Sequence, residues 1–438
     1  MRDLFAALPD DPAPPLASGY LDEVLTRGRR SVRRRRLGTA AAWTIIVLAL
    51  AALLLPGVPL PARPASPAHH PSLPDHFAGY SVLTSTVERD APGRAIAIYG
   101  YGNGETLNMF QPLVVGADGD TYRRVGALEE RNGALGLLSP DGTQVILGDD
   151  RGPARDLVLV DLTTGRHRSI PLPAPLGVRL LAWSPDARYV AYSAGAVGPS
   201  DGSSNFVESE VLRIGTLRLL DVTTGRSTEI PSIRGPWTAA FAPDGTRFAV
   251  QVATTAHILD LRGTEQAAIP LGDGHGLVAG AGWTPDGRYL TTVPWTGTEL
   301  DHSTFLSLEV AATFVPLAGP ATPPAAVEDV VRVLGWRDAT HMIAATTNGS
   351  ALSLTEINLT TGDRQILSNF DTAMTCELGM QHCEVYDLQL ATGLLPDLTV
   401  RHARSPDRGP WPWLLRIPIA VALIAAATLF RLLRRRRR

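Results

Sequence analysis

The chain has 438 residues, enough for two to three ordinary domains or for one large repeat domain with further segments. With 45% hydrophobic and 19% charged residues, it is neither wholly disordered nor collagen-like, nor a short disulfide scaffold. All 40 basic residues are arginine, and 14 of them lie in residues 1–36 and 431–438. Residues 62–410 carry 25 Arg against 38 Asp and Glu, a net charge of −13, which disfavours nucleic acid and other phosphate-rich partners.

Two apolar stretches near the chain ends have the length of membrane-spanning helices. They cover residues 37–55 and 413–433, and about 20 residues at a rise of 1.5 Å each cross a hydrocarbon core of roughly 30 Å. Arginines crowd the N-terminal side of the first stretch and the C-terminal side of the second. By the positive-inside rule, both termini are expected in the cytoplasm, and the residues between the stretches are expected outside the plasma membrane.

The flanking segments fit this topology, although alternatives stay open. Residues 1–36 are expected to be a basic cytoplasmic segment that either lies on anionic lipid or binds a cytoplasmic partner, and residues 434–438 a cytoplasmic arginine tail. The first span could instead belong to a twin-arginine signal or a cleaved signal peptide, but 36 preceding residues exceed a usual basic n-region. Seven prolines predict an extended stalk over residues 56–76, and residues 405–412 are interpreted as a linker.

A short turn motif recurs in the central part of the chain. Pro-Asp turns lie at Pro140, Pro185, Pro243 and Pro285, at spacings of 45, 58 and 42 residues, and a degenerate copy lies at Trp336–Ala339. Proline presets the first turn dihedral, aspartate hydrogen-bonds its own backbone and glycine accepts a positive φ, so such turns join antiparallel strands. A second turn with Thr-Thr-Gly follows in three copies, at Asp161–Gly165, Asp221–Gly225 and Asn358–Gly362. Four short strands per 40 to 50 residues predict a β-propeller.

Together these turns resemble the TolB-type, WD-like β-propeller family. An aromatic and a small residue before Pro-Asp-Gly, and a later Asp-x-x-Thr-Gly, match the family pattern over about residues 134–367 in five repeats. The pair of predicted spans and the arginine-only, proline-rich composition further resemble doubly anchored membrane proteins of actinobacteria. The resemblance implies a propeller fold.

The expected fold class is therefore all-β. Residues 77–404 are expected to form a propeller of six to seven four-stranded blades, flanked by two transmembrane α-helices. The first blade would use strands at 80–84, 95–99, 112–115 and 122–125. Two further strands, at 384–390 and 398–401, would be either a partial seventh blade or a closing pair.

No motif in the sequence predicts catalysis, a cofactor or a metal site. The nearest imitation of a nucleophile elbow is Ala191–Gly195, which lies at the end of an expected strand rather than before a helix. Cys376 and Cys383 are the only cysteines, and a disulfide between them is favoured over free thiols or a metal site with His382.

Binding is expected at the irregular connections between the second and third strands of the blades. These share one face of a propeller, whereas the uniform turns share the other, and long irregular loops are where scaffold folds usually carry binding. The alternative is that these loops are tolerated insertions. The expected ligand-binding residues are Tyr101, Asn103, Asp201, Asn205, Phe206, Glu208, Trp295, Glu299, Asp301 and His302.

The favoured function is a membrane-anchored extracytoplasmic propeller that binds or scaffolds a protein, peptide or cell-envelope ligand, without enzymatic activity. In the alternative, the propeller is a sensor that regulates a cytoplasmic factor bound by residues 1–36. A third possibility is a glycan-acting enzyme in the propeller channel, which would need clustered acids or histidines there.

Overall fold

The computed structural model describes residues 70–79, 81, 83–101, 111–131, 136–149, 152–198, 206–294, 310–318, 322–348, 351–370 and 385–410. All of them belong to one compact unit, residues 58–412. The expected cytoplasmic segments and both expected spans lie outside the described residues, as do residues 56–69 of the expected stalk.

The expected transmembrane helices require a correction. Among the described residues, no helix is long and apolar enough to cross a membrane. The longest, α3 (Phe206–Ile214), has nine residues and covers about 14 Å, less than half of a hydrocarbon core of roughly 30 Å. The prediction of a fold flanked by two membrane spans, and of a plasma-membrane location, is therefore not upheld; residues 37–55 and 413–433, on which it was based, lie outside the described part.

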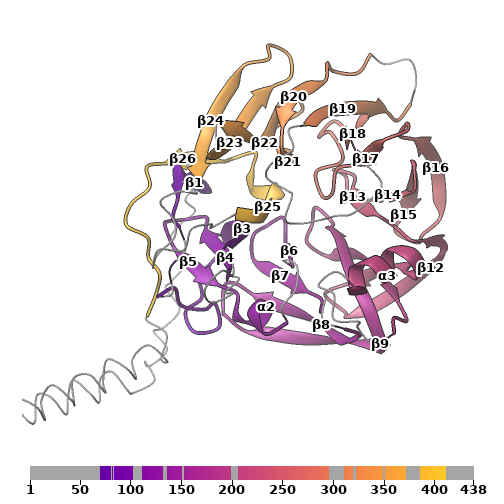
Figure 1. Cartoon of the computed structure of the whole chain (residues 1–438), viewed down its shortest axis with the longest axis horizontal. Coiled ribbons are helices and arrows are strands. Elements are labelled where there is room, and N and C mark those ends of the chain that lie inside the picture. Colours follow the sequence, from indigo (N-terminus) through magenta and orange to yellow (C-terminus); the bar gives the residue numbers. More distant parts are fainter. Residues whose placement is uncertain are drawn as a thin grey trace, which may run out of the picture. The chain divides into compact units, whose positions relative to one another are not determined.

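Short antiparallel strands form sheets that stand around a ring in a propeller-like arrangement (Figure 1). Four of these sheets are separate blades of four or five strands. In spatial order, the strands of the first blade are β25 (Val385–Leu390), β3 (Ala95–Tyr101), β4 (Gln111–Gly116) and β5 (Tyr122–Arg124). The second blade contains β13 (Thr238–Phe241), β14 (Arg247–Val252), β15 (Thr255–Asp260) and β16 (Glu265–Pro270), and the third contains β17 (His275–Leu277), β18 (Tyr289–Pro294), β19 (Val310–Pro316) and β20 (Val327–Val330). The fourth contains β2 (His76–Phe77), β24 (Arg364–Phe370), β23 (Ala351–Asn358), β22 (His341–Asn348) and β21 (Arg332–Trp336).

The remaining strands of the ring form one sheet of seven. Its order is β12 (Arg226–Arg234), β11 (Thr216–Asp221), β10 (Tyr189–Gly195), β9 (His167–Trp183), β8 (Ala154–Asp161), β7 (Gln144–Leu147) and β6 (Leu137–Leu138). The first half of β9 pairs with β8 and its second half with β10. The predicted six to seven separate four-stranded blades are therefore wrong, because an extended 17-residue strand offers hydrogen-bonding groups to both neighbours and joins two expected blades.

Two short helices and a 3₁₀ turn complete the described part. Helix α2 (Gly126–Arg131) follows β5, α3 lies between β10 and β11, and η2 (Thr392–Leu394) follows β25. A further pair of strands, β1 (Ser72–Pro74) and β26 (Thr399–Arg401), runs parallel outside the larger sheets.

Indole groups join inner segments of the ring at equivalent places in the repeat. The Nε1 of Trp183 donates to the carbonyl of Leu137 at 2.9 Å, and that of Trp283 to Ala240 at 2.9 Å. Trp336 repeats the contact with Ala281 at 3.1 Å. Each indole is buried at the end of an inner segment, just before a Pro-Asp turn or its degenerate copy. The aromatic residue of the repeat thus fills the space between inner segments and donates to a carbonyl of the preceding one.

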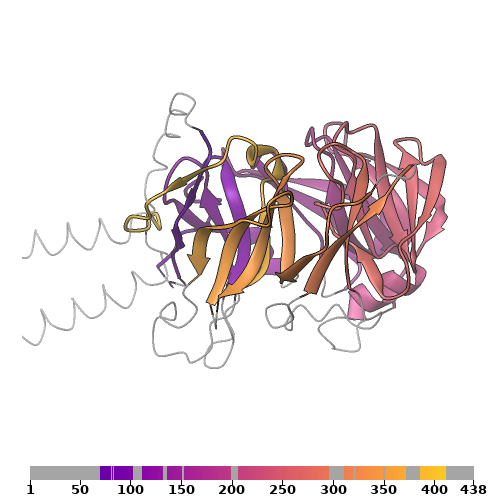
Figure 2. The same ribbon diagram turned by 90° about the horizontal axis from the view of Figure 1, so that it is seen from above.

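The two ends of the described chain exchange strands to close the ring. C-terminal β25 pairs with β3 and becomes the inner strand of the most N-terminal blade, while N-terminal β2 adds to β24. Figures 1 and 2 show β25 in yellow beside the indigo N-terminal strands. Strands were predicted at 384–390 and 398–401, but β25 and β26 do not pair with each other. The strand predicted at 80–84 is absent from the described residues of that segment because β25 takes its place.

Arginine side chains hold residues 401–408, near the C-terminal end of the described chain, against the blade formed by β25, β3, β4 and β5. Arg123 is buried, with 3% of its side chain exposed, and donates to the carboxylate of Asp90 and the carbonyl of Asp407. Arg401 binds Asp120 at 2.9 Å, and Arg408 donates to the hydroxyl of Thr84 at 3.0 Å. The segment is thereby held on the outer side of the sheet that β25 completes.

Candidate functional site

The two faces of the ring differ in how their polar groups are used. The turn face carries the tight turns at residues 139–143, 184–188, 242–246 and 284–288. The connection face carries the chain between β3 and β4, β10 and β11, and β18 and β19. On the turn face, carboxylates bind their own turns: Asp161 Oδ1 accepts hydrogen bonds from the amides of Thr163 and Thr164. Burial alone would raise the pKa of Asp161, but these hydrogen bonds lower it below its ordinary value.

Three of the ten residues predicted to bind a ligand lie in the described part of the chain. Asn103, Asp201, Asn205, Trp295, Glu299, Asp301 and His302 lie outside the described residues, as do Cys376 and Cys383. Tyr101 is the last residue of β3 and Phe206 the first of α3, so both mark strand or helix ends at the connection face. Glu208 is the one predicted residue with a described side chain.

Glu208 holds α3 against the seven-stranded sheet. Its Oε1 lies 2.9 Å from Nε of Arg179 on β9, and the two side chains are 18% and 16% exposed. Arg179 also donates to the carbonyl of Trp237, and the side chains of Val207 and Val211 on the helix itself are buried. The charge of Glu208 is therefore balanced within the fold, a contact that its sequence neighbourhood did not indicate.

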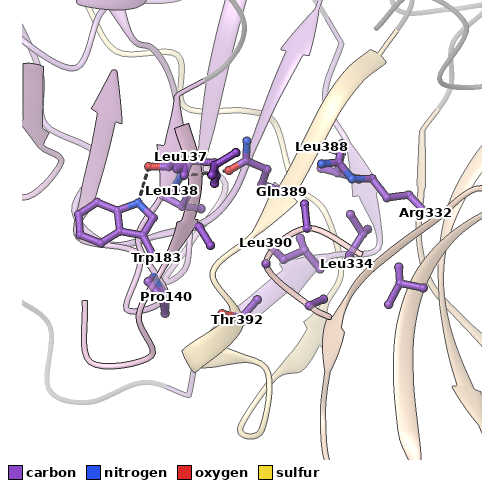
Figure 3. A pocket seen from close by; sticks show the side chains of 16 residues that line it. Leu137, Leu138, Pro140, Trp183, Arg332, Leu334, Leu388, Gln389, Leu390 and Thr392 are labelled. Carbon is purple, nitrogen blue, oxygen red and sulfur yellow. Dashed lines mark hydrogen bonds between the residues drawn. The ribbon is translucent and has the colours of Figure 1, made fainter. Parts of the chain in front are cut away.

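A cavity of about 90 Å³ lies where the inner strands of different sheets converge (Figure 3). Ligand pockets for drug-sized molecules measure about 300 to 1,000 Å³, so this cavity suits only a small guest. Most of the described residues that line it have apolar side chains, although the wall exposes about as much polar as apolar surface, and Arg332 is the one charged residue among them. The lining comes from β6, the end of β9, residues 279–281, β21, β25 and Thr392.

Gln389 on β25 fastens this strand to the next sheet beside the cavity. Its Nε2 donates to the carbonyl of Gly136 at 2.9 Å, and its Oε1 accepts from the amide of Leu138 at 3.1 Å. One side-chain amide thus pairs with two backbone groups as a neighbouring strand would. Neither Gln389 nor Arg332 was predicted from the sequence as a site residue. The sequence signal that could have identified Arg332 is its position as a basic residue directly before the apolar run Val333–Trp336.

The cavity has two different ends. Because β21 runs from Arg332 towards the turn after Trp336, Arg332 lies towards the connection face. Figure 3 shows Arg332 and Leu388 near one end and Pro140 and Thr392 near the other. At the second end, η2 crosses between sheets: Gly393 N donates to Pro140 O at 2.9 Å, and Leu395 is buried against Gly335.

The described part of the chain shows neither a metal-binding cluster nor, at Ser193, the geometry of a nucleophile elbow. No group of three or more His, Cys, Asp or Glu there could hold a metal ion. Ser193, from the imitation of a nucleophile elbow, lies within strand β10, paired with Arg179 and Leu217 of the neighbouring strands. It therefore lacks the strand-to-helix turn of an elbow.

Neither a family model nor a curated protein matches the sequence. Among solved structures, TolB from Acinetobacter baumannii is 16% identical with a TM-score of 0.44, covering 68% of this chain and 67% of its own. An oligogalacturonate lyase in complex with manganese is 15% identical with a TM-score of 0.42, covering 70% and 81%. Dipeptidyl peptidase 4 of Porphyromonas gingivalis is 13% identical with a TM-score of 0.33, covering 59% and 42%. The propeller-like arrangement itself follows from this chain's own strand pairing. The resemblance to doubly anchored actinobacterial proteins is not confirmed.

Proposed function

We propose that this propeller is a non-enzymatic binding or scaffold module whose connection face recognises a protein, peptide or cell-envelope ligand. The observation that carries the proposal is the contrast between the two faces. Turn-face carboxylates such as Asp161 and Asp221 are engaged in their own turns. The chain between β18 and β19, by contrast, runs through 15 residues at the connection face. Long connections on a rigid scaffold are the usual place for recognition.

The charge of these connections narrows the chemical class of ligand that the connection face would bind. Residues 102–110, 148–153, 199–205, 295–309 and 371–384 join strand or helix ends at the connection face, and together they contain ten Asp or Glu and one arginine. Opposite charge steers association and favours a matching partner. A ligand with exposed arginine or lysine side chains is therefore favoured over nucleic acid.

Binding of charged peptides tests the proposal directly. Arginine-rich and glutamate-rich peptides of equal length would be titrated into the full-length protein at low and high salt. The arginine-rich set is expected to bind more tightly and to lose affinity as salt rises, because exposed charges are screened. Phe206→Ala and Trp295→Ala are expected to weaken binding, whereas Gln266→Ala on the exposed outer strand β16 should leave it unchanged. Equal binding of both peptide sets, or unchanged binding by the first two variants, would contradict the proposal.

A further inference from the structure

Parallel pairing in the described part of the chain involves only its two terminal segments, residues 70–90 and 399–409. Strand β1 runs parallel to β26 and β2 to β24, and parallel bridges join Thr86 to Arg124 and Thr121 to Asp407. All other strand pairs described there are antiparallel. Strands joined by a tight turn are antiparallel, so parallel contacts arise where a segment comes from elsewhere in the chain.

The direction of β1 and β26 decides how this pair responds to tension. The strands are in register over three residues, with Ser72 beside Thr399. Thr399 N donates to Pro71 O, and Asp75 N to Arg401 O, each at 2.9 Å. In a parallel pair, the chain enters one strand and leaves the other at opposite ends. Pulling on these two ends therefore slides the strands along each other and loads their hydrogen bonds together rather than one at a time.

The side chain of Arg401 fastens this pair to the turn between β4 and β5. Its Nε binds Asp120 Oδ1 at 2.9 Å, and its Nη2 donates to the carbonyl of Gly119 at 2.8 Å. Its Nη1 donates to the carbonyl and the hydroxyl of Ser72, whose amide donates to Ala117 O at 2.8 Å. The side chains of Arg401 and Asp120 are 17% and 9% exposed, so water screens this ion pair little. One guanidinium thus joins β26, β1 and the turn.

The residues after β26 are bonded to the same blade. Asp407 N donates to Asp120 O at 2.7 Å, and Tyr122 N donates to Asp407 O at 2.9 Å. Ser85 N donates to Arg408 O at 2.8 Å. The bridge between residues 121 and 407 is again parallel, so a pull on the outgoing chain slides it along β5.

Both ends of the described part are therefore fixed to one turn. Residue 72 bonds to residue 117 and residue 407 to residue 120. The sequence continues on both sides, with residues 1–69 and 411–438, so tension from either flanking segment reaches the ring at these two points. The bonded path between the points runs through residues 117–120 and bypasses residues 137–370.

We propose that the closure of the ring is a mechanical clamp made of residues 70–90, 111–124 and 399–409. Tension between the two flanking segments is carried by its parallel contacts in shear, and the other sheets bear no load until the clamp breaks. The clamp acts whatever the connection face binds, because that face lies outside the loaded path. A ligand held there stays on a folded ring while the ends are pulled.

Single-molecule pulling on the full-length protein tests the clamp by direction. DNA handles are attached through azide-bearing residues introduced at positions 70 and 410, or at positions 70 and 397. Residues 70 and 397 precede β1 and β26 on the same side of the pair, so the second direction opens the same bonds one at a time. The rupture force across 70 and 410 is expected to be at least about twofold higher, because several bonds must break together. Equal forces overturn the proposal.

The order of events under load gives a second readout. No step of about 40 Å, the extended length of residues 399–409 at ~3.5 Å per residue, should precede the main rupture across 70 and 410. Such a step at low force would mean that this segment peels away before the ring is loaded. That outcome also overturns the proposal, and it is measured on the protein without a stability variant.

A variant assigns the resistance to the arginine crosslink. Arg401→Gln should remove most of the difference between the two pulling directions, because it unfastens β26 from Ser72 and Asp120. The matched control is Arg94→Gln, whose side chain binds Asp118 of the same turn at the surface and should leave both forces unchanged. A purely structural role for Arg401 would lower both forces in the same proportion, and that result would contradict its place in the clamp.

Discussion

The inner segments of this ring are joined in two different ways. Between β6 and β21, three buried indoles donate to inner-segment carbonyls 43 to 55 residues earlier, as Trp283 does to Ala240. Where β25 completes the first blade, the joints are polar and link residues more than 250 positions apart, as Gln389 does with Leu138 and Arg123 with Asp407. The first kind of joint repeats with the motif, whereas the second occurs once, where the chain ends meet. Repetition therefore builds the ring and long-range polar contacts close it.

Loss of Arg123 should be the most damaging single change at the closure. Arg123→Met removes the described donor of the Asp90 carboxylate and one of the two donors of the Asp407 carbonyl, which keeps the amide of Tyr122, and removing one partner of a buried ion pair costs about 3 kcal/mol or more. Urea unfolding of the full-length protein measures the loss. The control is Arg94→Met, whose side chain is 36% exposed and pairs with Asp118 at the surface; it should change stability by about 0.5 kcal/mol or less. Equal losses would mean that closure does not depend on the buried clamp.

Loss of one indole joint should cost less. Trp283→Phe keeps an aromatic ring but removes the indole hydrogen bond to the carbonyl of Ala240, an expected loss of about 1 kcal/mol in the free energy of unfolding. Trp183→Phe and Trp336→Phe remove the same contact in other copies and should give similar losses by thermal unfolding. Widely different values among the three would show that the joints are not equivalent.

A turn substitution should act in the opposite direction. Ala187 has a φ of +55° where the corresponding Gly142, Gly245 and Gly287 have +67° to +71°. Ala187→Gly is expected to stabilise the protein by about 0.5 kcal/mol, because only glycine adopts this conformation without strain. The reverse change, Gly287→Ala, meets no atom within 4 Å and should destabilise by about 1 kcal/mol through φ alone. Melting temperatures that move the other way would exclude turn strain as the cause.

The smallest effect is expected at Asp338 in the degenerate turn copy. Burial opposes ionisation of its carboxyl, but hydrogen bonds from the Thr340 amide and from His341 lower its pKa to about 2 from an ordinary 3.8. Because the folded-state pKa lies below the unfolded one, its stabilisation is present above about pH 4 and disappears as the pH falls towards 2. The side chain is 51% exposed, so solvent screens the effect. The stability difference between the protein and Asp338→Asn should shrink over this range in melting curves, and a constant difference would refute the assignment.

The turns and most strands could be predicted because their interactions are local. Asp161 binds amides two and three residues away, and glycine such as Gly165 takes the positive φ that the turn requires. Three of the four strands predicted for the first blade are present, at β3, β4 and β5. The fourth was assigned to the nearest β-prone residues, whereas the true partner, β25, comes from the other end of the chain.

The candidate site was less predictable than the fold. Glu208 was selected as an exposed acid in an irregular loop, yet its partner Arg179 lies 29 residues earlier on another element. Arg332 and Gln389 belong to strands that read as ordinary apolar segments, and their place beside a cavity depends on how four sheets converge. Spacing along the chain contains no information about such a meeting point.

By itself, the sequence determined the repeated four-strand pattern, the chemistry of its turns, the aromatic residue of each joint and the acidic balance of the central residues. Only the tertiary structure decided that β9 pairs with both β8 and β10, and that β25 pairs with β3 while β2 pairs with β24. It also decided that Arg332 lines the cavity. The reason is physical: turn hydrogen bonds form within a few residues and need no distant partner. Ring closure, in contrast, brings together residues about 250 to 330 positions apart, and its partners become defined only when all sheets are in place.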